Sequence, residues 1–412
     1  MGDTASDRSP AGTFSETTSP GRPTPRLIWQ ALAIAGGWVP LSIAVGQSVA
    51  LRSNELGAPT ATYSLLVAGG WAVSMLSLPA MGHIADRVVR RGIDRRVLVV
   101  IGAIGMLACF LLLGVSGSLP LFALIWLLAQ IPTSLIVTAA SSRLANEAPA
   151  HRRGWASTAA GLAPVLAITI GAATTLALSD ISSVLFIAPA IVGAALLIPS
   201  LILRPLPTAT PDADSPAPAH QTRFYPWALL IAIALAFSGL AVGRIYLVPL
   251  LESVSTSLSD ARVTALASTA LLVATLGAVV GTFVSGRILR SGQRPMATFG
   301  WFSLASAVPL IGLALASSVG QVIAFGAIFG FVIGAINAAA YGIFLHRYSQ
   351  RSDPARILGL IVAAETVPYV IVPLAAAVTQ ASADAALIPV LFAIGSALAV
   401  SASVLTFAKL RN

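Results

Sequence analysis

Charged residues are scarce in this chain of 412 residues, because Asp, Glu, Lys and Arg together make up only 9% of it. A typical soluble domain carries about 25% charged residues, so the composition excludes an ordinary soluble globular protein. The net charge of +9 does not indicate nucleic-acid binding, since that function needs basic faces exposed to solvent. With 57% hydrophobic residues and a mean hydropathy of +0.88, the sequence predicts an integral membrane protein.

Several chemistries lack the residues they need. Cys109 is the only cysteine, which excludes disulfides and cysteine-based metal sites. The four histidines are scattered, so we predict no metal site. The sequence contains no Walker phosphate-binding loop and no cluster of nucleophile, base and acid. We therefore predict no enzymatic activity, no catalytic residues and no cofactor.

Long apolar runs fill most of the chain. A membrane-spanning helix needs about 20 mostly apolar residues, and twelve runs meet this requirement. The predicted fold class is an all-α integral membrane protein with twelve transmembrane helices. The predicted spans cover residues 27–51, 60–82, 96–116, 119–142, 155–178, 183–203, 226–250, 263–286, 296–317, 320–345, 357–379 and 386–408.

The positions of the arginines predict the orientation of the spans. If the N-terminus is cytoplasmic, all but three of the 24 basic residues fall on the cytoplasmic side. The exceptions are Arg52, Arg244 and Arg262. Because cytoplasmic loops carry an excess of Lys and Arg, both termini are predicted to be cytoplasmic. We expect a multi-pass protein of the plasma (inner) membrane.

The second half of the chain repeats landmarks of the first half 204 residues later. The repeated pairs are Gly82 and Gly286, Arg143 and Arg347, Arg152 and Arg356, and Pro164 and Pro368. Residues 1–26 predict a disordered cytoplasmic tail, and the Pro- and Ala-rich residues 204–225 predict a cytoplasmic linker. The repeat predicts two six-helix bundles, over 27–203 and 226–412, which is an arrangement typical of transporters.

The stretch GHIADRVVRRGIDRR, residues 82–96, has a Gly, three residues, Asp-Arg and then an arginine-rich turn with Gly. It resembles the signature loop between helices 2 and 3 of the major facilitator superfamily, and the resemblance extends over residues 27–408. The resemblance implies two pseudo-symmetric six-helix bundles and secondary transport of a small organic solute by alternating access. The expected partners are that solute, protons and the lipid bilayer, with no nucleic acid, and we expect a monomer.

The resemblance also implies a conformational latch on the cytoplasmic side. Gly82 would permit a tight helix exit, and Asp86 would lie near the N-terminal end of the eleventh span. An anion at a helix N-terminus is favoured by about 0.3–1 kcal/mol. The arginines that follow would hold acidic partners, of which Glu147 is the available one. The predicted latch residues are Gly82, Asp86, Arg87, Arg90, Arg91, Glu147 and Arg152.

In that family the first, fourth, seventh and tenth helices line a central cavity, so polar residues on these spans are candidate substrate contacts. A lipid-facing amide would be left unpaired, which favours Gln130 and Asn337. A serine or threonine hydroxyl has an alternative, because it can bond back to its own helix. Arg244 would contact the substrate or pair with Glu252. The predicted substrate-binding residues are Gln47, Gln130, Ser134, Arg244, Asn337 and Tyr341.

Glu365 lies within a predicted span, in the apolar setting AAETVPYV. An ionisable residue at the centre of a membrane helix costs at least about 2.5 kcal/mol, so it usually faces a cavity or a partner. Apolar surroundings disfavour the ionised carboxylate, which makes Glu365 the candidate proton carrier. The alternative is a structural partnership with a cytoplasmic arginine such as Arg143.

The loop over residues 82–96, and DPARILGL before the eleventh span, resemble those of glycoside- and sucrose-type cation symporters. This resemblance favours proton-coupled symport of a sugar or glycoside. The alternative is proton-coupled efflux of lipophilic drug-like compounds. The apolar cavity walls favour efflux, but the arginine that drug exporters carry in helix 4 is replaced by Leu127. A non-transporting sensor or scaffold would have no need for paired loop motifs.

Overall fold

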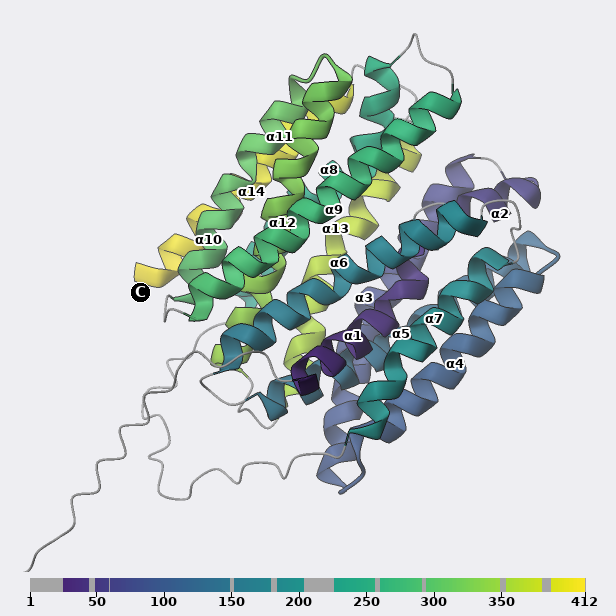
Figure 1. Cartoon of the computed structure of the whole chain (residues 1–412), viewed down its shortest axis with the longest axis vertical. Helices are drawn as coiled ribbons and strands as arrows, with labels where there is room; N and C mark the ends of the chain where they lie inside the picture. The colour runs from purple at the N-terminus through teal and green to yellow at the C-terminus, as the bar shows by residue number, and fades with distance from the viewer. Residues whose placement is uncertain are drawn as a thin grey trace, which may run out of the picture.

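The structure is a computed structural model that describes residues 25–43, 49–58, 60–148, 152–178, 184–203, 226–255, 260–290, 294–348, 353–379 and 387–411. The elements within these ranges are helices that run side by side (Figure 1). They are α1 (Pro25–Ile43), α2 (Val49–Glu55), α3 (Thr60–Arg90), α4 (Arg95–Val115), α5 (Leu119–Glu147), α6 (Arg153–Leu178), α7 (Val184–Ile202), α8 (Pro226–Val254), α9 (Asp260–Arg290), α10 (Pro295–Ala305), α11 (Ala307–Ala314), α12 (Val319–Arg347), α13 (Pro354–Thr379) and α14 (Leu387–Arg411).

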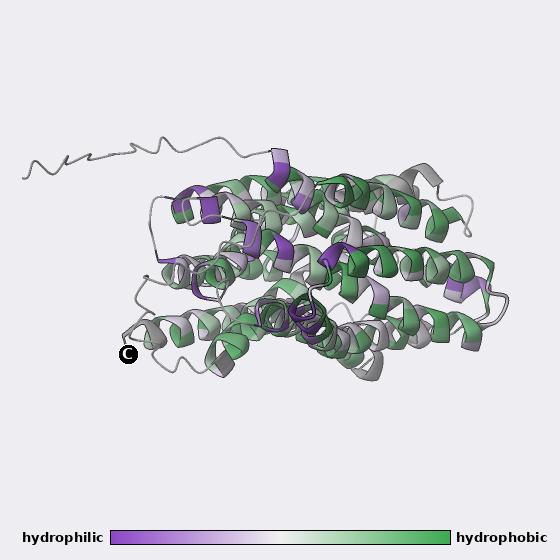
Figure 2. Cartoon of the chain, turned by 90° about the horizontal axis from the view of Figure 1, so that it is seen from below, coloured by the Kyte–Doolittle hydropathy of each residue, from purple (hydrophilic) through white to green (hydrophobic). Residues whose placement is uncertain are grey.

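The predicted all-α membrane fold is confirmed. Among the described residues, ten helical stretches are long and apolar enough to cross a membrane, with α10 and α11 forming one of them. The helices α1 and α6 occupy the two remaining predicted spans. Figure 2 shows that the long helices are predominantly hydrophobic. Large apolar side chains such as Leu76, Val115 and Leu315 are more than two-thirds exposed, as expected where lipid covers the surface.

The predicted signature loop is mostly helical. We predicted that the second span ends at Gly82, but α3 continues to Arg90. No helix breaker occurs between these residues, and the helix need not stop where its apolar run stops. Gly92, with a φ of 77°, adopts the left-handed conformation that glycine tolerates, and it lies in the short turn before α4. The prediction that Gly82 permits a tight helix exit is therefore wrong.

The ninth predicted span is broken into α10 and α11 at Ser306. Pro309 explains the break, because proline has no N–H to donate and its ring clashes with the carbonyl four residues earlier, that of Ala305. The Ser306 N–H bonds the Phe302 carbonyl, and Ser306 accepts from the Leu310 N–H, so the chain continues in nearly the same direction.

The twelve membrane helices form two pseudo-symmetric six-helix bundles, which Figure 1 shows on opposite sides of the molecule. The bundles meet along helices from both halves: α3 packs against α13, and α6 packs against α9 and α12. We use "arginine-rich end" for the end of the molecule that holds the last turns of α3, α5 and α9 and the first turns of α6 and α13. The tail up to residue 24 and the linker 204–225 lie outside the described residues.

Candidate functional site

At the arginine-rich end, Asp86 of α3 joins the two bundles. Its side chain is buried, and its carboxylate accepts hydrogen bonds from the backbone N–H groups of Ala355 (3.2 Å) and Arg356 (2.9 Å). These groups lie in the first turn of α13, where N–H groups have no partner within the helix and the dipole favours an anion. The structure thus places Asp86 at the N-terminal end of the eleventh span, as the resemblance implied.

Gly82 makes the approach of α3 and α13 possible. A Cβ atom on Gly82 would meet the carbonyl group of Ala355, and one on Gly359 would meet the carbonyl group of Leu78. Because the obstacles are backbone atoms rather than flexible side chains, larger residues at these positions would push the two helices apart. Gly82 therefore serves the contact between the bundles.

The arginine beside Asp86 is not one of those predicted. Arg95, the first residue of α4, lies 3.7 Å from the Asp86 carboxylate (Nη2 to Oδ1). Arg87, Arg90 and Arg91 are exposed and form no ion pair with any residue that the structure describes. The prediction that these three arginines hold Glu147 is wrong.

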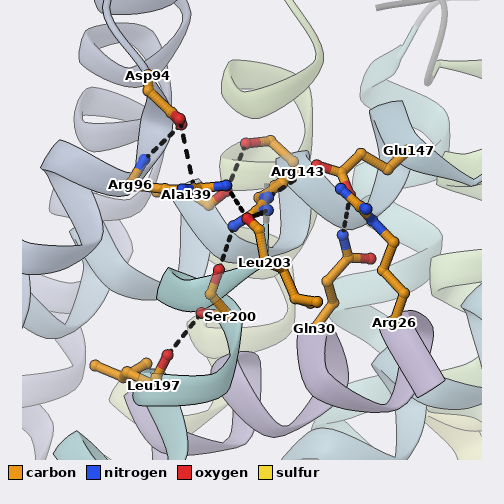
Figure 3. A network of polar contacts seen from close by, with 11 residues as sticks. Arg26, Gln30, Asp94, Arg96, Ala139, Arg143, Glu147, Leu197, Ser200 and Leu203 are labelled. Carbon is orange, nitrogen blue, oxygen red and sulfur yellow. Dashed lines mark hydrogen bonds and ion pairs between the residues drawn. The ribbon is translucent and has the colours of Figure 1, made fainter. Parts of the chain in front are cut away.

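Glu147 belongs instead to a network within the first bundle (Figure 3). Its carboxylate pairs with Arg26 of α1 at 2.7 Å and with Arg143, one turn earlier in α5, at 2.8 Å. Gln30 also donates to it. Arg143 donates further to the carbonyl oxygens of Ser200 and Leu203 at the end of α7. The network thus ties α1, α5 and α7 together, and these contacts among the described residues lie within the first bundle.

Arg152, the remaining predicted latch residue, lies directly before α6 and is half-buried. Within the described parts of the chain it makes no ion pair. The structure therefore brings together Gly82 and Asp86 of the predicted latch and adds Arg95, which lies within electrostatic reach of both Asp86 and Glu147.

The second copy of the motif makes a related contact with different chemistry. Gly286 of α9 faces the side chain of Thr158 in α6, as Gly82 faces α13. Arg290 stands 204 residues after Asp86, and its guanidinium carbon lies 3.8 Å from the centre of the Trp155 ring in α6. A cation over an aromatic face is attracted by the ring quadrupole. The sequence analysis did not predict this stacking pair.

The predicted polar residues of α5 form hydrogen bonds within the first bundle. The Gln130 amide donates to the Trp126 carbonyl of its own helix at 3.3 Å. The hydroxyl groups of Ser134 and Ser77 are 2.7 Å apart, which joins α5 to α3. Gln47 lies outside the described residues, and Arg244 lies in α8 with its side chain outside the described set.

Glu365, Tyr341 and Ser141 lie close together where α13, α12 and α5 meet. Tyr341 is buried, within electrostatic reach of Glu365 and within reach of the Ser141 hydroxyl. Glu365 Oε1 is buried and has no hydrogen-bond partner among the described residues. Its suggested partner Arg143 is bound to Glu147 instead. Asn337, one turn before Tyr341 in α12, is also buried.

An aromatic cluster that we did not predict adjoins these residues. The rings of Trp38 (α1) and Trp71 (α3) are 6.3 Å apart between centroids, and those of Trp71 and Tyr369 (α13) are 5.3 Å apart. Tyr369 follows Glu365 by one helical turn, a spacing that places both on one face of α13 and was visible in the sequence.

Comparisons with known proteins agree with this geometry. The sequence profile of the Major Facilitator Superfamily matches residues 28–306. The chain belongs to the major facilitator superfamily. A crystal structure of the human organic anion transporter MFSD10 (TETRAN) resembles it with a TM-score of 0.66 and 15% identity, over 92% of this chain and 97% of that one. No curated protein sequence matches the chain.

Membership of the superfamily makes this a multi-pass membrane protein and a secondary transporter of a small solute. Members of the superfamily are typically transporters rather than enzymes. The structural likeness, at 15% identity, concerns the fold.

Proposed function

We propose that the protein is a proton-coupled secondary transporter of a small organic solute, that it works by alternating access, and that Glu365 carries the proton. The observation behind this proposal is the buried Oε1 of Glu365, which has no hydrogen-bond partner among the described residues. A buried carboxylate without a paired cation is costly, and a proton neutralises it. Tyr341 of α12 lies within electrostatic reach of Glu365 and within reach of Ser141 of α5, so residues of both bundles surround this position.

The closed arginine-rich end supports alternating access. Two contacts each join one helix of the first bundle to one of the second: Asp86 of α3 binds the first turn of α13, and Arg290 of α9 stacks on Trp155 of α6. We propose that these contacts form the latch, and that they break when this end opens. The arginine distribution supports a cytoplasmic position for this end and for both termini of a monomer in the plasma membrane.

Two solute classes remain candidates. The resemblance to glycoside- and sucrose-type symporters favours a sugar or glycoside. The hydrogen bonding of α5 favours a lipophilic solute instead, because the Gln130 amide nitrogen and the Ser134 hydroxyl group already have protein partners, which leaves fewer groups for a sugar's hydroxyl groups. Ligands that bind the folded state raise the melting temperature, so disaccharides, glycosides and lipophilic compounds are compared first on the purified protein.

The coupling is tested with Glu365→Gln in proteoliposomes loaded with the solute found in this way. The wild-type protein should concentrate the solute against its gradient when a pH difference is imposed, and Glu365→Gln should equilibrate it without concentrating it. Glu252→Gln is the matched control, because Glu252 is an exposed carboxylate near the far end of α8. If Glu365→Gln still concentrates the solute, Glu365 does not carry the proton.

A further inference from the structure

We propose that Trp38, Trp71 and Tyr369 form a subsite for a planar aromatic solute that carries hydrogen-bond acceptors such as carbonyl or ester oxygens. The inference rests on the proposed transport function and specifies its solute. We expect this subsite to favour a planar aromatic solute over a sugar, because a flat aromatic ring can make offset-stacked or edge-to-face contacts with the Trp and Tyr rings.

Two buried donors point to the acceptors. The indole Nε1 atoms of Trp38 and Trp71 are buried and have no hydrogen-bond partner among the described residues. Trp38 is 9% exposed and Trp71 is 8% exposed. Trp126 of the same bundle shows the ordinary situation, because its Nε1 donates to the Leu66 carbonyl oxygen at 2.8 Å. Buried donors are nearly always paired, so two neighbouring unpaired ones indicate a place for a ligand's acceptors.

The aromatic surfaces point to a flat ring. The centroid separations of 6.3 and 5.3 Å fall in the range of interacting rings, and the interplanar angles of 36° and 32° keep the three rings from stacking flat on one another. A planar solute would add stacking contacts to this cluster. A saturated solute of the same size could pack its C–H groups on the rings but could not form aromatic ring–ring contacts with them.

The location of the cluster links binding to transport. Trp38 and Trp71 belong to the first bundle and Tyr369 to the second, so a solute held by all three contacts both bundles. Glu365 lies one turn from Tyr369 on α13, which brings the proposed proton carrier beside the solute. Binding at this subsite would therefore be sensed by both moving halves.

The test uses coumarin and methyl 2-naphthoate, two planar aromatic molecules with acceptor oxygens, and naphthalene, which lacks them. Binding is measured as the concentration-dependent rise in melting temperature of the purified full-length protein in detergent. We expect both oxygenated probes to bind the wild-type protein and naphthalene to bind at least about fivefold more weakly. A neutral hydrogen bond contributes roughly this much to affinity.

The variants Trp38→Phe and Trp71→Phe keep a ring and remove the indole N–H. Each should weaken coumarin binding by about five- to tenfold and leave naphthalene binding unchanged. Trp227→Phe is the matched control, since Trp227 is 64% exposed on α8 and should change neither probe. If one variant does not fold, as judged by its melting transition without probe, the other carries the comparison.

The proposal is overturned if neither oxygenated probe stabilises the wild-type protein, or if the Phe variants bind them as the wild type does. The latter result would mean that the indole N–H groups of Trp38 and Trp71 donate to water and not to the probe. These outcomes are independent of the proton test. Probe binding that depends on Trp38 and Trp71, together with full pH-driven uptake by Glu365→Gln, would retain the subsite and reject Glu365 as the proton carrier.

Discussion

Replacing Asp86 by Asn removes the charge from the contact between α3 and α13 and keeps nearly the same shape. The carboxylate now accepts two backbone hydrogen bonds, from Ala355 and Arg356, and lies 3.7 Å from Arg95. Asn can supply one oxygen to one N–H, but its amide nitrogen would face the other. A hydrogen bond to a charged group contributes about 1.5–3 kcal/mol, and the helix dipole adds about 0.3–1 kcal/mol.

We therefore expect Asp86→Asn to destabilise the closed state by about 2 kcal/mol. This change raises the population of the state that is open at the arginine-rich end by roughly 30-fold. Thr158 of α6 reports on that opening, because it is buried against Gly286 of α9 in the closed state. A Thr158→Cys reporter in a Cys109→Ala background should react with a maleimide only in the open state. Its labelling rate should then rise roughly 30-fold in Asp86→Asn.

Arg87→Gln is the control for this experiment, because Arg87 lies next to Asp86 but is exposed and forms no ion pair with a described residue. It should leave the labelling rate unchanged. Transport by Asp86→Asn should be slower at normal expression, because the balance between the two states is shifted. An unchanged labelling rate in Asp86→Asn, with a wild-type transport rate, would refute the latch.

Three further changes test the surrounding contacts. Gly82→Ala should raise the reporter's labelling rate because its Cβ would force α3 away from α13, whereas Gly117→Ala, in open space, should not. Arg290→Gln should raise the labelling rate by about two- to fivefold, since a cation–π contact contributes about 0.5–1 kcal/mol. An unchanged rate would contradict a role of the stacking pair in the closed state. Glu147→Gln should lower the melting temperature, because it breaks a buried ion-pair network worth about 3 kcal/mol, and it should not change the labelling rate. Glu55→Gln is its control: Glu55 belongs to an exposed ion pair, so its replacement should leave the melting temperature unchanged.

The helices could be predicted because their signal is local. Each membrane span is an apolar run of the necessary length, and every predicted span except the first and the ninth coincides with a single helix in the described part of the chain. The first, 27–51, extends beyond α1 to α2, with residues 44–48 outside the described ranges, and the ninth is divided into α10 and α11. The end of α3 could not be predicted in this way, because hydropathy marks where lipid ends and not where hydrogen bonding ends. The same reason explains why α9 extends beyond the predicted end of its span: it continues four residues past Gly286, to Arg290.

Partners of side chains were predicted less well because they depend on packing between distant segments. Glu147 was assigned to arginines near Asp86 by charge alone, but the packing of α1 against α5 places Arg26 beside it. The contact of Trp71 with Tyr369 joins residues almost 300 positions apart, and no local pattern announces it. Asp86 was located correctly because the resemblance carried information about the whole fold.

The two copies of the signature motif illustrate how one backbone arrangement accepts opposite charges. In both copies a glycine lets the last turns of one helix lie against the first turns of a helix from the other bundle. In the first copy the positive N-terminal end of α13 lies against the last turns of α3, and the negative charge of Asp86 complements it. In the second copy Arg290 occupies the corresponding position, where the positive end of α6 would repel it, and the Trp155 ring provides an attractive surface instead. The closed end therefore has one electrostatic contact, at Asp86, that a helix dipole strengthens. It also has one stacking contact, at Arg290, that a helix dipole opposes. We therefore expect Asp86 to dominate the closed state and Arg290 to adjust it.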